Sequence, residues 1–129
     1  MLANRIDMAI KDAALALHPN IKEALCAEFR GTVTLSMHVQ DGVLNHLKSG
    51  ISEALDLEET GERTKPTQEQ TAAVMRAVGF ILRGKLPSVL APGFHGTMLL
   101  AMTFESGKLQ NAECEAEKVT KPTAVKVGR

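Results

Sequence analysis

Tryptophan and tyrosine are absent from the sequence, and four phenylalanines are its only aromatic side chains apart from histidine. Sheets that bind single-stranded nucleic acid normally stack the bases on aromatic side chains. Phe94 and Phe104 lie at positions that we expect to be buried in a core. The composition therefore argues against an RNA-recognition sheet.

Cysteine is also scarce, since the chain contains only Cys26 and Cys114. Two cysteines fall short of the disulfide framework of a small secreted domain, so we expect a reduced, cytoplasmic protein. No apolar run is long enough to cross a bilayer. The first residues lack the unbroken apolar segment of a signal peptide. We therefore expect no contact with a membrane.

The formal net charge is zero, which removes the simplest argument for nucleic-acid binding. The charges are unevenly distributed, because residues 52–62 carry five acids and no base, and residues 118–129 carry four bases and no acid. Most runs of this kind are solvated surface. Duplex DNA binding by the basic second helix and tail remains the alternative function. Its candidate residues are Arg76, Arg83, Lys85, Lys121, Lys126 and Arg129.

The chain contains two similar stretches, GTVTLSMHVQDGVLNHL at 31–47 and GTMLLAMTFESGKLQNA at 96–112. A shift of 65 residues aligns them without a gap and superposes Gly42 on Gly107. In both stretches apolar and polar residues alternate, which is the pattern of a half-buried strand, and each run ends in a glycine turn. We expect two antiparallel hairpins, over residues 32–51 and 97–118.

The turns allow two strand registers. A two-residue turn would place Leu35 opposite Lys48 and bury a charge. A three-residue turn with a bulged glycine places Leu35 opposite Leu47 and, in the second hairpin, Met98 opposite Cys114. We therefore predict the three-residue turn in both hairpins.

A helix is expected ahead of each hairpin. Apolar residues recur at helical spacing from Ile6 to Leu17, and we expect Pro19 to interrupt this helix, with Asn20 capping a short second one. In the second half, Thr67 and Gln70 have the spacing of a capping box. The residues at 83–96, rich in proline and glycine, are expected to form a turn or a loose coil.

Together these elements predict an α+β fold with the order α-β-β-α-β-β, a four-stranded antiparallel sheet and both helices on one face. We expect a single domain over residues 1–129, built as a pseudo-repeat of two halves at about 1–55 and 66–120. A polar linker at 56–66 joins the halves, and a basic tail follows at 118–129.

Few residues are candidates for chemistry. His38 and His46 lie on the solvent side of the first hairpin as diagonal neighbours, but zinc needs further donors, so we predict no metal site and no cofactor. Glu113, Glu115 and Glu117 alternate on one strand face; we interpret them as charges that keep an edge strand from aggregating, with cation binding as the alternative. No nucleophile elbow or phosphate loop is present. We predict a protein that is not an enzyme.

The open face of the sheet is the strongest candidate for function. A partly apolar open face is typical of a surface that binds a second copy or another protein, although the linker or the tail is an alternative cover. We expect a small binding or regulatory protein, of the size of bacterial and phage accessory factors, that forms a homodimer or binds a protein partner. The candidate residues on this face are Leu99, Ala101, Thr103, Leu109 and Leu44.

Overall fold

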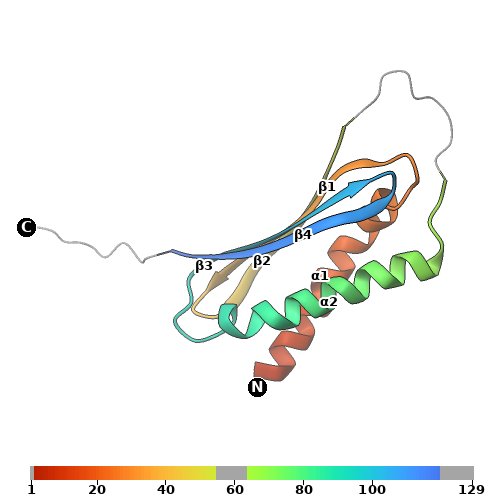
Figure 1. The fold of residues 1–129 in the computed structure, drawn as a ribbon. Coiled ribbons are helices and arrows are strands. Elements are labelled where there is room, and N and C mark those ends of the chain that lie inside the picture. Colours follow the sequence, from red (N-terminus) through yellow and green to blue (C-terminus); the bar gives the residue numbers. More distant parts are fainter. Residues whose placement is uncertain (1, 55–63, 120–129) are drawn as a thin grey trace, which may run out of the picture.

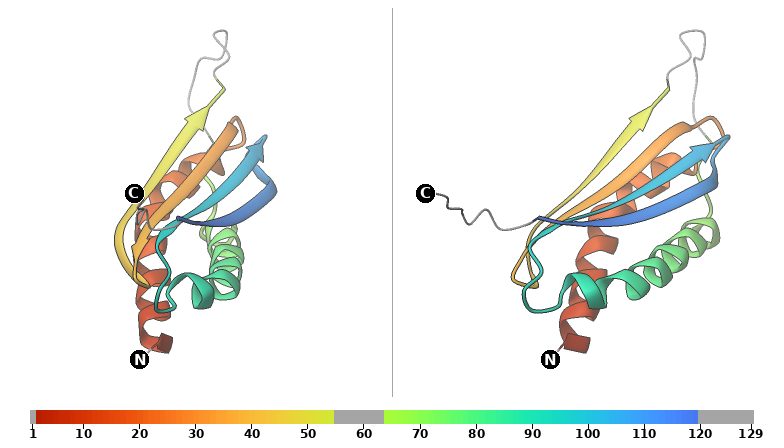
Figure 2. Two further views of the ribbon diagram at one scale, coloured as in Figure 1. Left: turned by 90° about the vertical axis from the view of Figure 1, so that its left-hand side faces the viewer. Right: turned by 60° about the vertical axis from the view of Figure 1, so that its left-hand side comes forward.

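The computed structural model describes residues 2–54 and 64–119. In this part of the chain, four strands form one antiparallel sheet with the order β2-β1-β3-β4, and two helices pack against one of its faces (Figures 1 and 2). The predicted α+β architecture and element order are confirmed. The elements are α1 (Leu2–Ala24), β1 (Arg30–Gln40), β2 (Val43–Glu53), α2 (Gln68–Val89), β3 (Gly96–Glu105) and β4 (Lys108–Lys118).

The core lies between the sheet and the helix layer. Alternate residues of the two central strands are fully buried, among them Leu35 and Met37 on β1 and Leu100 and Met102 on β3. Each such side chain contributes roughly 1.5–3 kcal/mol by leaving water. The helices complete the core with residues three or four positions apart, namely Ala9, Ala13, Leu17, Ile21 and Ala24 on α1, and Val74, Val78, Leu82, Leu86 and Val89 on α2.

Both helices continue through a proline, so the predicted breaks are wrong. Pro19 lies inside α1, and Pro87 lies inside α2. A helical proline leaves the carbonyl four residues earlier without its N–H donor. Pro19, Pro87, Leu15 and Arg83 are all exposed, so both affected carbonyls belong to the side of the helix that faces water. The core-facing stripe is therefore undisturbed and holds the last turn of each helix in place.

Specific hydrogen bonds define the start of α2 and connect α1 to the sheet. Thr67 and Gln70 form the predicted capping box, in which each side chain accepts a hydrogen bond from the other residue's backbone N–H. Asn20 caps no helix, because α1 continues past it; its side-chain amide donates to the Ser49 hydroxyl at 2.8 Å and ties α1 to β2. Among the described residues, neither helix is long and apolar enough to cross a membrane.

The hairpins have two-residue turns, not the predicted three-residue turns. Asp41 and Gly42 both have positive φ (50° and 72°), as the favoured hairpin turn requires. One extra residue, Asn45, then bulges from β2 between the pairs Val39–Leu44 and His38–His46 and shifts the register by one. The bulge, and not the turn, keeps charge out of the core.

The second hairpin repeats this arrangement. Its turn is Ser106–Gly107, and its bulged residue is Gln110. The predicted residue pairs are each displaced by two positions: Leu35 lies opposite Ser49, and Leu100 lies opposite Cys114. A displacement by two preserves the face, so Leu47 and Cys114 still pack against the core, as expected.

A local two-fold axis relates the two halves. In the β1–β3 ladder Leu35 lies opposite Leu100, which is its own equivalent under the 65-residue shift. The shift also relates hydrogen bonds between the halves: Gly42 N–H donates to the Phe94 carbonyl (2.9 Å), and Gly107 N–H donates to the Phe29 carbonyl (3.1 Å). Each hairpin turn therefore packs against the chain that follows the other half's helix.

Candidate functional site

The face of the sheet opposite the helices, which we call the open face, includes four cross-strand rows that span all four strands. From β2 to β4 the rows are His46, His38, Thr97 and Glu117; Lys48, Ser36, Leu99 and Glu115; Gly50, Thr34, Ala101 and Glu113; and Ser52, Thr32, Thr103 and Asn111. Small and hydroxyl-bearing residues dominate its centre. Leu99 is the one large aliphatic side chain among these rows, and it is 45% exposed.

The structure places only part of the predicted protein-binding set on this face. Leu99, Ala101 and Thr103 lie there, whereas the placement of Leu44 and Leu109 is wrong. Leu44 pairs with Val39, and Leu109 pairs with Phe104, so both face the helices and pack against the core. The bulges are the physical reason, because they reverse the facing of the residues between themselves and the turn.

The two histidines of the first hairpin lie directly opposite each other and not diagonally. The ring centroids of His38 and His46 are 5.7 Å apart, and both side chains are exposed. A zinc site needs three or four converging donors. Within the described residues, no group of three or more His, Cys, Asp or Glu side chains is placed to hold a metal ion.

The basic residues of α2 do not form one surface. Arg83 forms an ion pair with Asp7 of α1 at 2.9 Å, on the side of α2 that faces α1. Lys85 lies near Cys114 of β4, where burial raises the pKa of the thiol and the lysine charge acts in the opposite direction. Arg76 is exposed and lies two turns before Arg83, on the same side of α2, whereas Lys85 lies on the opposite side. Lys121, Lys126 and Arg129 lie outside the described residues, as does most of the predicted linker at 56–66.

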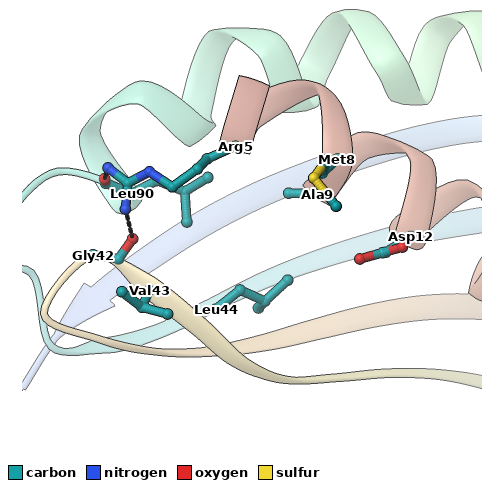
Figure 3. Close-up of a pocket in the computed structure, with 8 residues that line it drawn as sticks. All are labelled: Arg5, Met8, Ala9, Asp12, Gly42, Val43, Leu44 and Leu90. Atoms are coloured by element: carbon teal, nitrogen blue, oxygen red, sulfur yellow. Dashed lines mark hydrogen bonds between the residues drawn. The ribbon is translucent and has the colours of Figure 1, made fainter. Parts of the chain in front are cut away.

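A groove of about 200 Å³ opens between α1, the first hairpin and the end of α2 (Figure 3). One wall is two turns of α1, and the other is the start of β2. The lining is largely apolar, with Arg5 and Asp12 as its charged members (Figure 3). The residues that line the groove are Arg5, Met8, Ala9, Asp12, Gly42, Val43, Leu44 and Leu90.

Arg5 fixes the shape of this groove. Its guanidinium donates to the carbonyls of Gly42 and Leu90, both at 3.2 Å, and so joins α1 to the first hairpin turn and to the C-cap of α2. The turn is held further by the Asp41 carboxylate, which accepts from Gly93 N–H at 2.7 Å. Three separate segments of the chain therefore meet at a defined geometry.

Met8 and Val43 contribute the groove's exposed apolar surface. Met8 is 65% exposed, and Val43 is 51% exposed, although both are large apolar side chains. Leu15, two turns further along α1, and Phe80 on α2 are also exposed, the latter at 82%. Leu15 and Phe80 lie outside the groove and are the single exposed apolar residues common on any surface, whereas Met8 and Val43 are exposed side by side in an apolar groove, as is typical of a binding surface.

Sequence reasoning missed the groove. Met8 is out of phase with the apolar stripe of α1, and this was the only available signal. Val43 follows the turn and faces the groove because the hairpin turn packs beside α1, a tertiary contact that no local pattern encodes. Leu44, which the sequence predicts as a binding residue of the open face, lines the groove on the opposite side of the sheet.

Comparison of the chain with protein-family models, with curated proteins and with solved structures gives no significant match.

Proposed function

We propose that this protein is a small, non-enzymatic binding module that docks a short apolar segment of a partner protein in the groove. The observation that carries the proposal is the groove's lining, in which exposed Met8 and Val43 stand beside half-buried Leu44 and buried Leu90. This apolar area is exposed to water when the chain is alone. A partner that covers it removes the area from water, which favours binding.

The size of the groove supports a peptide segment as the ligand. Pockets for cofactors and drug-sized ligands usually enclose about 300–1,000 Å³, whereas about 150 Å³ already accommodates benzene. A groove of about 200 Å³ matches one or two aliphatic side chains. Arg5 and Asp12, one turn to either side of Met8 and Ala9, offer a donor and an acceptor to the backbone of such a segment.

The chemistry of the lining supports a role in binding and not in catalysis. A guanidinium has no acceptor atom, and that of Arg5 already donates to two backbone carbonyls, so it is unsuited to act as a base. A cytoplasmic, reducing environment is part of the proposal. Cys26 and Cys114, the only cysteines of the sequence, form no disulfide between them.

The test is affinity capture from a lysate of the source organism with three matched baits, with and without nuclease. Wild type and Phe80→Glu should retain the same nuclease-resistant protein, and Met8→Glu should lose it. Phe80→Glu is the control because it makes the same chemical change at a more exposed site outside the groove. Equal capture by all three baits would contradict the groove.

The nuclease arm tests the alternative of duplex DNA binding. If everything captured disappears with nuclease and binding weakens steeply with salt, the basic residues, and not the groove, bind the ligand. The separation of Lys85 from Arg83 and the ion pair of Arg83 with Asp7 argue against a continuous basic surface on α2.

A further inference from the structure

The open face carries opposite charges on its two edges. The β2 edge presents the positive charge of Lys48, with His46 beside it, and the β4 edge presents the negative charges of Glu113, Glu115 and Glu117. Among the described residues, Lys48 and these three glutamates make no ion pair. The two columns are separated by β1 and β3, so the charges of one edge are too far from the other edge to pair within the chain.

We infer that the open face binds a second copy of this chain, face to face, about a two-fold axis parallel to the strands. Such an axis places β4 of one copy over β2 of the other and keeps each row opposite the same row. Glu115 then meets Lys48 of the second copy, and Glu117 meets His46 of the second copy. A two-fold axis across the strands would instead place acid over acid, so the charge pattern selects one orientation.

The centre of the face fits the same arrangement. Leu99 lies on β3, next to the axis, and approaches Leu99 of the second copy across it. The neighbouring positions are small or bear hydroxyls, such as Ser36, Thr34 and Ala101. At Gly50 a Cβ atom would come within 3.1 Å of the Thr34 hydroxyl oxygen, so this glycine keeps the face low. Two faces with few protruding side chains can approach to the spacing of packed sheets.

The twist of the sheets is compatible with these charge pairs between the two copies. Packed sheets are rotated by about 30° relative to each other, which displaces the outer strands by about one residue. Lysine and glutamate side chains span that displacement. An isologous contact of this kind is self-complementary, so each charge pair occurs twice in the dimer.

The area of the face sets the expected affinity. Four strands about 4.8 Å apart and seven residues at about 3.4 Å each give a footprint of roughly 450 Å² per copy. The pair buries about 900 Å², which is at the low end for specific interfaces. We therefore expect a weak, concentration-dependent dimer and not an obligate one.

The test is sedimentation equilibrium of the purified chain from about 10 µM to 1 mM, the range of weak affinities. Wild type should shift from monomer to dimer. Lys48→Glu alone and Glu115→Lys alone should each raise the dissociation constant at least about tenfold, because each creates two like-charge contacts. Lys11→Glu, an exposed charge reversal on α1, is the control and should leave the constant unchanged.

The decisive arm mixes the two single variants, Lys48→Glu and Glu115→Lys. In their heterodimer the two reversed side chains face each other with opposite charges, and the native Lys48 of one copy faces the native Glu115 of the other. Mixing should therefore restore association that neither variant shows alone. A monomer throughout the concentration range, or a dimer indifferent to both reversals, would overturn the inference. Met8→Glu should not change this dimer, because the groove is on the other side of the sheet; the two proposals therefore fail separately.

Discussion

The guanidinium of Arg5 donates to the carbonyl of Leu90, so the first turns of α1 hold the C-terminal end of α2 across 85 residues of chain. The same group donates to Gly42, which makes it a three-way junction at the base of the groove. The residue equivalent to Arg5 under the 65-residue shift is Gln70, whose side chain belongs to the capping box of α2. The two halves share a fold, but only the first has this junction.

Replacing Arg5 should loosen the groove. Arg5→Met keeps the aliphatic stem and removes both charge-assisted hydrogen bonds, which we expect to lower the free energy of unfolding by about 1 kcal/mol. Urea unfolding followed by circular dichroism measures this loss. Lys11→Met, an exposed substitution on the same helix, is the control and should be close to neutral. Equal midpoints for the two variants would show that the junction contributes nothing.

Leu35 and Leu100 should be equally costly to truncate. Both side chains are fully buried and face each other at the local axis, so Leu35→Ala and Leu100→Ala should each lower the free energy of unfolding by about 2–5 kcal/mol. The double variant should depart from additivity because the two side chains are in contact. Leu99→Ala, on the open side of the same strand, should cost less than about 1 kcal/mol. A loss at Leu99 as large as that at Leu100 would contradict the assignment of the two faces.

The turn glycines should tolerate no side chain. A Cβ at Gly42 would lie 2.4 Å from the Ala91 carbonyl oxygen, and one at Gly107 would lie 2.4 Å from the Cys26 carbonyl oxygen. Both glycines also have a φ of 72°. We expect Gly42→Ala and Gly107→Ala each to lower the free energy of unfolding by about 2 kcal/mol or more.

Gly93 separates the two causes of this loss. Its φ is 87°, but a Cβ there would meet nothing within 4 Å. Gly93→Ala should therefore cost only the conformational part, about 1 kcal/mol. Thermal unfolding of the three variants side by side measures the difference. If Gly93→Ala is as harmful as Gly42→Ala, close approach of the turn to the neighbouring backbone is not the cause.

Cys114 should make stability depend on alkaline pH. Burial raises its thiol pKa, partly opposed by Lys85, so the folded state holds this proton more tightly than the unfolded state. The stabilisation is complete below the ordinary thiol pKa of 9.0 and is lost as pH rises from there through the folded-state pKa. The free energy of unfolding of wild type should therefore fall relative to that of Cys114→Ala above pH 9.0. Parallel pH profiles for the two proteins would contradict a raised pKa.

Alternation and capping could be predicted from the sequence because both are local. The strands were placed within a few residues by the period of two, and the capping box followed from the spacing of Thr67 and Gln70. The choice of core face for Leu47 and Cys114 was also correct, since any register that buried apolar residues had to preserve it.

The incorrect predictions concern positions at which tertiary packing overrides a local sequence rule. Pro19 and Pro87 end isolated helices, but here their lost hydrogen bonds face water, while the core stripe holds the last turns. The burial of Lys48 was avoided by a bulge at Asn45, which no composition marks. The groove combines residues from three segments, so its existence depends on how the first hairpin turn packs against α1.

The pairing of Leu35 with its own equivalent, Leu100, means that the central seam of the sheet is a contact between halves. The two halves therefore associate as the two subunits of a dimer would, but within one chain, so their association is unimolecular. A tether of this kind supplies an effective concentration in the millimolar range, far above what two separate halves would experience. In an isolated half, β1 or β3 would be an edge strand whose unpaired backbone groups could pair with a strand of any other chain. The covalent link between the halves thus favours the pairing of β1 with β3 and also disfavours the pairing of either strand with another chain.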